Sequence, residues 1–198
     1  KIMRKISFIL IVILLEVFIG VSGLYISIAQ EYNKNYKQDM RDFIKNISSY
    51  AKNKKKDFII IPQNGQELLT ENGLANDKIS IDYINAIDGI GREDLFYGYD
   101  GINKLTPLNE QNKMIKFLDI AKNNGLVVMV TDYCFTKPFV DNSYKNCDKK
   151  GYISFVAADR ELNKIPKYPA KPNKVNNLDI VLLKDARNFL YLINPNNF

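Results

Sequence analysis

Three short apolar runs in this 198-residue chain each end at a polar cluster. The runs cover residues 58–61, 87–91 and 126–131, and the clusters that follow them are Pro62-Gln63-Asn64-Gly65, Arg92-Glu93-Asp94 and Asp132-Tyr133-Cys134. A short apolar run bounded by turn residues is typical of a strand buried on both faces of a parallel sheet. Because β/α folds place their reactive groups at the C-terminal ends of such strands, the pattern indicates a site.

Helical patterns alternate with these expected strands. One helix is expected over residues 35–53, with an apolar face that docks on a sheet. The apolar residues that predict this face recur every three or four positions and are Met40, Phe43, Ile44, Ile47 and Ala51. A second helix is expected over residues 108–124, with Gly125 ending it. Further strands are expected over residues 152–157 and 189–193, so the alternation predicts parallel β/α units.

The length of the chain limits how complete a β/α fold it can form. An eight-stranded β/α barrel takes about 250 residues. Only 169 residues follow Ala29, where an apolar N-terminal segment ends. The sequence therefore predicts an α/β fold that is either part of a TIM-type barrel or a small open sheet.

The first 30 residues are expected to be a signal peptide or a membrane anchor. Lys1, Arg4 and Lys5 precede residues 6–29, which carry a single charge at Glu16. A cleavable signal has about 7–15 apolar residues and a small-residue exit, whereas a spanning helix needs about 20 apolar residues. Both alternatives fit. In either case the basic residues keep the N-terminus cytoplasmic, so the remainder is expected to be extracytoplasmic, secreted or anchored to the membrane.

Residues 31–198 are expected to form one domain, because 46% of the chain is hydrophobic. Within it, residues 160–187 are rich in proline and lysine and are expected to be extended on the surface. The net charge of +6 includes a lysine run over residues 52–56. Stacking aromatic residues do not alternate with these lysines, so we expect a solvated turn and no binding of nucleic acid.

The absence of histidine restricts the possible chemistry. It excludes nucleophiles that depend on a Ser-His or Cys-His pair. Two cysteines without histidine also fall short of the four ligands of a structural zinc site. No metal or cofactor is expected, since glycosidases work with carboxylates alone. An exported chain could join Cys134 and Cys147 in a disulfide, although their spacing does not require it.

Carboxylates, amides and tyrosines at strand ends suit the hydrolysis of glycosidic bonds, which needs two carboxyl groups and no histidine. Glu93 is the candidate acid, because it follows a strand and lies near Tyr97. A structural role is also open: Glu93 and Asp94 could cap a helix, and Asp132 could belong to an ordinary turn. Gln63 and Asn64 could likewise shape a tight turn.

Longer strings resemble glycoside hydrolase family 114. Two of them are Phe-Ile-Ile-Ile-Pro-Gln-Asn-Gly at residues 58–65 and Ala-Ile-Asp-Gly-Ile-Gly-Arg-Glu-Asp-Leu-Phe-Tyr at residues 86–97. Others lie at residues 40–43, 47–51 and 130–134, so the resemblance covers most of residues 38–160. The family contains endo-α-1,4-polygalactosaminidases and many bacterial extracellular proteins.

The resemblance implies a TIM-type barrel that acts on a galactosamine-containing exopolysaccharide. Glu93 occupies the position of the family's catalytic glutamate and would be the general acid/base. The residues expected to line the sugar subsites are Gln63, Asn64, Asp94, Tyr97, Asp132 and Tyr133.

Two departures from the family pattern bear on activity. The second catalytic carboxylate of the family follows a strand that reads like Gly-Phe-Asp-Gly-Val-Tyr-Leu-Asp, and no such string occurs here. Residues 185–192 resemble the strand that opens the family's barrel, yet they close this chain, so we expect a permuted order with the missing half beyond Phe198. Asp132 could replace the missing carboxylate only within about 5–9.5 Å of Glu93. The alternative is a non-catalytic carbohydrate-binding or cell-envelope module.

Overall fold

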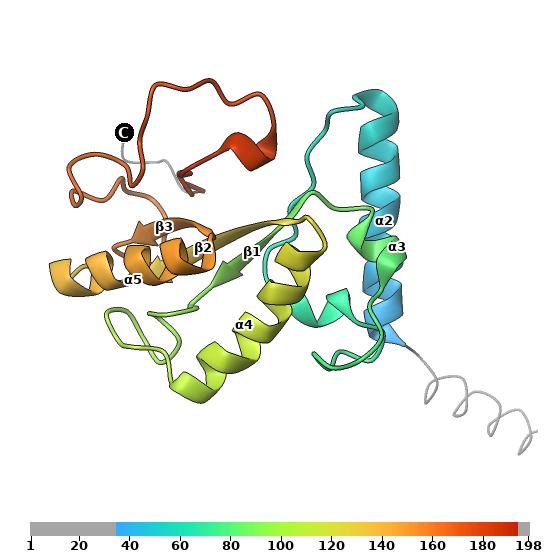
Figure 1. The fold of residues 1–198 in the computed structure, drawn as a ribbon, viewed down its shortest axis with the longest axis horizontal. Coiled ribbons are helices and arrows are strands. Elements are labelled where there is room, and N and C mark those ends of the chain that lie inside the picture. Colours follow the sequence, from blue (N-terminus) through green and yellow to red (C-terminus); the bar gives the residue numbers. More distant parts are fainter. Residues whose placement is uncertain (1–34, 194–198) are drawn as a thin grey trace, which may run out of the picture. The chain divides into compact units, whose positions relative to one another are not determined.

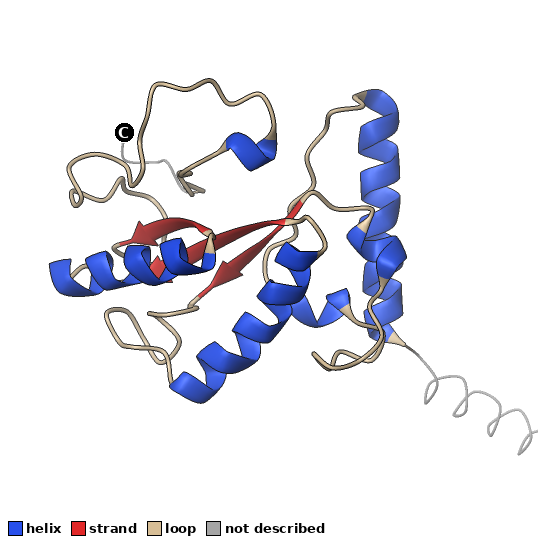
Figure 2. Cartoon of the chain, in the orientation of Figure 1, coloured by secondary structure: helices blue, strands red, loops and turns tan. Residues whose placement is uncertain are grey.

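Three parallel strands form the sheet of this α/β fold (Figure 1), which a computed structural model describes over residues 35–193. They are β1 (Gly89–Glu93), β2 (Val127–Tyr133) and β3 (Ile153–Ala157), and they lie in that order in the sheet. The helices, shown in Figure 2, are α2 (Tyr36–Lys54), α3 (Ile81–Ile84), α4 (Leu108–Asn123) and α5 (Lys137–Lys150), with short 3-10 turns η1 (Gln66–Leu69) and η2 (Leu183–Asp185).

The chain divides into two units, Lys1–Tyr36 and Lys37–Phe198, and the fold belongs to the second. The expected signal peptide or anchor lies outside the described residues. Among residues 35–193, no helix has both the length and the apolar character needed to cross a bilayer. The expected α/β class with parallel strands is confirmed.

The two faces of the sheet differ in what covers them. Ile90, Val130 and Val156 point to the face that packs against α4 and α5, and they belong to the main apolar core. Residues in register across parallel strands share a face, so Glu93, Thr131 and Phe155 lie together on the opposite face. The side chains of this second face, including Tyr133, are the ones that can reach a common site at the strand ends.

The apolar run of residues 58–61 does not form the buried strand that its sequence predicts. It runs parallel to the outer edge of β1, where Gly91 N donates to Pro62 O at 2.8 Å and Gln63 pairs with Gly91. Phe58 is 45% exposed, because the edge segment has a neighbouring strand on one side only among the described residues. The prediction of burial on both faces is therefore wrong, whereas the parallel placement beside β1 agrees with a β/α unit.

Helix α2 is present as predicted, but its predicted buried face is only partly right, because Ile44 packs against the core while three other residues of that face are exposed. Met40, Phe43 and Ile47 are between 43% and 59% exposed. Arg41 and Ser48 are buried instead, at 2% and 3% exposure. The helix docks through polar contacts because Ser48 Oγ donates to Ala86 O at 2.5 Å and the Arg41 guanidinium donates to three carbonyl groups of the 68–71 turn.

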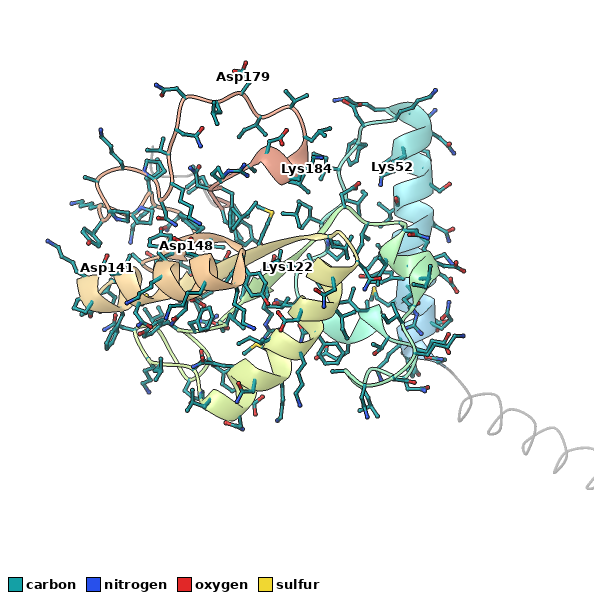
Figure 3. All side chains as sticks on the ribbon, viewed as in Figure 1. Lys52, Lys122, Asp141, Asp148, Asp179 and Lys184 are labelled. Carbon is teal, nitrogen blue, oxygen red and sulfur yellow. The ribbon has the colours of Figure 1, made fainter. Side chains whose placement is uncertain are left out.

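Ion pairing fixes the C-terminal end of the same helix. Lys52, labelled in Figure 3, lies 3.0 Å from Asp88, which directly precedes β1. Asp88 also accepts a hydrogen bond from Ile60 N at 2.8 Å. One carboxylate therefore ties together α2, the edge segment and the start of β1.

The remaining elements divide between confirmed and wrong predictions. The helix over residues 108–124 and the strands over residues 126–131 and 152–157 appear as α4, β2 and β3. The expected strand over residues 189–193 is absent; Phe189 packs against the cluster around Tyr133, with its ring centroid 5.8 Å from that of Phe155. Residues 160–187 contain η2 as their only helix or strand, in agreement with an extended segment.

Candidate active site

The ends of the strands bring five polar side chains into one network, those of Glu93, Asp94, Tyr133, Asn64 and Arg160. Glu93 is the last residue of β1 and Tyr133 the last of β2. Asn64 follows the edge segment, and Arg160 lies three residues beyond the end of β3. The clusters that end the apolar runs therefore meet at one edge of the sheet, as the sequence predicts.

Both carboxylate oxygens of Glu93 accept hydrogen bonds. Asn64 Nδ2 donates to Oε2 at 3.0 Å, and the Tyr133 hydroxyl donates to Oε1 through a short hydrogen bond. Glu93 N in turn donates to Asn64 Oδ1 at 3.1 Å. This reciprocal pair fixes the orientation of the Asn64 amide, so the Glu93 side chain receives a donor on each oxygen.

Tyr133 is suited to donate this hydrogen bond. Burial raises the pKa of its hydroxyl well above the ordinary value, and the hydrogen bond to Glu93 acts in the same direction. The phenol therefore stays protonated at neutral pH. Its ring packs with Phe155, Ala157 and Leu162, which restricts the positions that the hydroxyl can take.

Asp94 and Arg160 form the second half of the network. Arg160 Nη2 donates to Asp94 Oδ1 at 2.8 Å and to Gly98 O at 2.6 Å. The guanidinium carbon of Arg160 also lies 4.5 Å from the centroid of the Tyr133 ring. Burial raises the pKa of Asp94, while the ion pair with Arg160 opposes this shift. Asp94 has a φ of +59°, a left-handed conformation that few residues other than glycine adopt.

Gln63 lies over β1 where the strand lacks a side chain. A Cβ atom at Gly91 would lie 1.9 Å from Gln63 Oε1, so glycine is required at this position for the amide to approach. Gln63 is exposed and Asn64 partly exposed. Both amides are therefore accessible beside Glu93.

Asp132 does not join this network. It is fully buried on the helix-facing side of the sheet, where Oδ1 accepts from Phe96 N at 3.0 Å and Oδ2 accepts from Ser143 Oγ at 2.6 Å. Successive residues of a strand point to opposite faces. Asp132 therefore links the loop after β1 to α5, and the idea that it approaches Glu93 as a second carboxylate finds no support in the geometry.

Tyr97 also lies away from the network. It is 4% exposed, its hydroxyl donates to Asn142 Oδ1 at 3.1 Å, and its ring stacks on Phe139 with centroids 5.0 Å apart. Both partners belong to α5. The structure therefore brings together Glu93 with Gln63, Asn64, Asp94 and Tyr133, and it separates Asp132 and Tyr97 from them.

Arg160 is the member of the network that the sequence pattern did not reveal. It belongs to Ala158-Asp159-Arg160, which directly follows β3. This is the same sequence pattern as in the other three runs, an apolar run that ends at charged or polar residues. Because its position falls at the start of the proline-rich and lysine-rich segment, it reads as one solvated cation among many. Its position just after β3, the fourth apolar run along the chain, is the signal that could have identified Arg160.

A separate cavity lies on the helix-facing side of β1. It measures about 990 Å³ and lies between α4 and the loop after η1, with Arg92 and Tyr99 in its wall. Glu93 does not line it. Within residues 35–193 no group of three or more acidic or cysteine side chains is placed to hold a metal ion. Cys134 and Cys147 are both buried as free thiols.

The buried carboxyl group of Asp132 is expected to make the free energy of unfolding depend on pH. Burial raises the pKa of its carboxyl group from 3.8 to about 6, against the opposing hydrogen bonds from Ser143 and Phe96. A carboxyl group that binds its proton more tightly in the folded chain favours folding at low pH. This contribution is present below about pH 4 and is lost as the pH rises to about 6, a loss on the order of 2–3 kcal/mol.

The Asp132→Asn substitution should remove this dependence. The amide oxygen can still accept from Phe96 N, and the amide nitrogen can donate to the Ser143 hydroxyl. We expect urea unfolding to show that wild type loses more unfolding free energy than the variant between pH 4 and pH 7. Asp100→Asn, at an exposed position, is the matched control and should behave as wild type. Equal pH dependence in wild type and Asp132→Asn would contradict the prediction.

Comparison with known proteins adds one relative. No protein-family model matches the chain. The chain is 35% identical over 164 residues to an uncharacterized protein, MJ1477, of Methanocaldococcus jannaschii, a match that covers 74% of this chain and 45% of the relative. The chain thus spans less than half the length of this relative, and the name of the relative states no activity.

Proposed function

We propose that this chain is part of an extracytoplasmic glycoside hydrolase of the family 114 type, which cleaves a galactosamine-containing exopolysaccharide. Glu93 is its catalytic carboxylate, acting as general acid/base. The observation that carries the proposal is the position of Glu93 at the end of β1, with a donor on each carboxylate oxygen. A glycosidase needs a carboxylate held in one orientation toward the scissile bond.

The architecture proposed for the whole protein is a TIM-type barrel, of which this chain supplies one side. The support is the sequential order of parallel strands and the edge segment that runs beside β1. Parallel sheets occur almost only with both faces covered and, in barrels, without free edges. The exposed Phe58 at the sheet edge and Met40, Phe43 and Ile47 on α2 are apolar surface that further β/α units would cover.

The second carboxylate is the incomplete part of the site. Glycoside hydrolysis uses two carboxyl groups on either side of the scissile bond. Asp132 faces α5, and Asp94 is the other carboxylate that the network joins to Glu93, through Arg160 and Tyr133. Because Arg160 neutralises Asp94, we propose that the partner carboxylate comes from another part of the protein.

The sugar subsites in this proposal are built on the exposed amides. Gln63 and Asn64 offer donors and acceptors to sugar hydroxyl groups beside Glu93. Asp94 and Tyr133 form the wall of the same site, while Tyr97 lies outside it, bonded to Asn142 of α5. The polysaccharide is then the main partner, and the membrane is a second partner if residues 1–30 are retained as an anchor.

The experiment is an assay of reducing-end release from polygalactosamine by the native full-length polypeptide, together with retention on an immobilised form of the same polymer. Release of reducing ends supports the hydrolase. Retention without release favours the non-catalytic carbohydrate-binding module, for which the displaced Asp132 is the specific observation. If the polypeptide neither releases reducing ends nor is retained on the polymer, the proposed function is contradicted.

A further inference from the structure

We propose that Arg160 is a positioning residue of this site. Its guanidinium group holds the Tyr133 ring and the Asp94 carboxylate, so that the Tyr133 hydroxyl donates to Glu93 in one fixed geometry. The inference rests on the proposed function where it concerns activity. The contacts that support it belong to residues on three different strand ends.

The first support is that one side chain makes three unlike contacts. Arg160 Nη2 bridges Asp94 Oδ1 at 2.8 Å and Gly98 O at 2.6 Å, while the guanidinium carbon lies over the Tyr133 ring, 4.5 Å from its centroid. Arginine is suited to this combination, because its planar group can stack on an aromatic face while its edges donate hydrogen bonds. Lysine could replace the charge but not the flat contact.

The second support is the way in which Tyr133 is enclosed. Phe155, Ala157 and Leu162 pack around the aromatic ring, and the Arg160 guanidinium covers it. The hydroxyl at the end of the ring donates to Glu93 Oε1. Moving the guanidinium away frees the ring to shift, and a shift of the ring displaces the donor from the carboxylate.

The third support is electrostatic. Asp94 directly follows Glu93 and is partly buried, and its side chain is 17% exposed where it meets Arg160. Burial raises the pKa of Asp94, and Arg160 opposes that rise. Without Arg160, Asp94 either carries an uncompensated charge beside Glu93 or takes up a proton at higher pH. Both outcomes change the field at Glu93.

Gly98 shows that the arrangement is built closely. Its φ is +126°, and a Cβ atom there would lie 2.1 Å from Asp94 Oδ1. The absence of a side chain at position 98 leaves room for the Asp94 carboxylate to reach Arg160. The Gly98 carbonyl supplies the second acceptor for the same Nη2 atom.

The test uses the full chain with Arg160→Met, which keeps most of the side-chain length but removes the charge and the planar donor group. We expect kcat for polymer cleavage to fall about 10- to 100-fold with a nearly unchanged KM, because the reacting group is misplaced while sugar contacts remain. The pH profile should shift as well. Arg160→Lys should restore the pH profile in part through its ion pair with Asp94, and should restore kcat less.

A readout independent of activity is the ¹³C signal of the tyrosine ring carbon bonded to the hydroxyl, assigned by its loss in Tyr133→Phe. Arg160→Met should shift the Tyr133 signal and its titration. The matched control is Lys164→Met, which removes an exposed cation four residues away that pairs with Asp159, and it should leave the signal unchanged. An unchanged Tyr133 signal in folded Arg160→Met would overturn the proposal.

A double substitution separates the two roles of Arg160. If the guanidinium acts partly by neutralising Asp94, the loss in kcat from Arg160→Met should be smaller in an Asp94→Asn background. Equal losses in both backgrounds would overturn the electrostatic part. If wild type releases no reducing ends, the proposed function fails, yet the Tyr133 signal still decides whether Arg160 positions the ring.

Discussion

Glu93→Gln is expected to lower the rate of polysaccharide cleavage by about 10²- to 10⁴-fold, the usual contribution of general acid–base catalysis. Glutamine keeps the length of the side chain but can neither release nor accept the proton that the reaction transfers. It also sets an amide NH₂ group against a donor, because Asn64 and Tyr133 both donate to the present carboxylate. The measurement is reducing-end release from polygalactosamine by the full-length polypeptide.

The control for this experiment is Glu110→Gln. Glu110 lies in the first turn of α4 and pairs with Lys113 at 2.8 Å, away from the strand-end network. Its replacement should leave the rate as in wild type. Thermal unfolding of both variants checks that the chains are folded. A folded Glu93→Gln protein with the wild-type rate would show that Glu93 is not the catalytic carboxylate.

Arg41→Met should produce the largest loss of stability among single substitutions of α2. Arg41 is 2% exposed and donates to the carbonyl groups of Leu68, Thr70 and Glu71 at 3.4, 3.0 and 3.1 Å. Methionine fills a similar volume but leaves these buried acceptors without donors. We expect a loss of about 3–5 kcal/mol in the free energy of unfolding, measured by urea denaturation.

Two further variants separate the causes of that loss. Arg187→Met removes another arginine that donates to backbone carbonyl groups, but at an exposed position, and should cost less than about 0.5 kcal/mol. Arg41→Lys keeps the charge and a single donor group, so its stability should lie between wild type and Arg41→Met. A loss in Arg41→Met no larger than in Arg187→Met would contradict the role given to these hydrogen bonds.

The parts of the fold that follow from local patterns could be predicted from the sequence. The periodic apolar residues of α4 predict a helix, and the β-branched runs of β2 and β3 predict strands. These predictions hold because each element is buried by elements that lie close in the chain. The meeting of Asn64 and Glu93 also follows, since parallel strands bring their C-terminal ends to one edge. These predictions depended on local sequence and on the geometry of parallel sheets.

The buried face of α2 could not be predicted in the same way. Its apolar stripe predicts a buried apolar face. The hydrogen-bond partners of Arg41, however, lie 27–30 residues further along the chain, and the sequence around Arg41 does not predict them. The edge segment shows a related limit. An apolar run predicts a buried strand, but it does not predict how many neighbouring strands pair with it in the sheet.

Asp132 and Tyr97 are the predicted site residues that the structure separates from Glu93. Asp132 and Tyr133 are consecutive strand residues, so their side chains point to opposite faces and only one of them can reach Glu93. The alternation rule was available from the sequence. The position of Tyr97 was not, because its partners Phe139 and Asn142 belong to α5, a helix that the apolar pattern did not predict.

The left-handed conformation of Asp94 has a consequence for how such a site can change. In a regular strand, two neighbouring carboxylates would be separated by the thickness of the sheet. Because Asp94 has a positive φ, the side chains of the consecutive residues Glu93 and Asp94 both reach the same network. Inserting or deleting a single residue at this junction would therefore redirect one carboxylate while leaving the sheet intact.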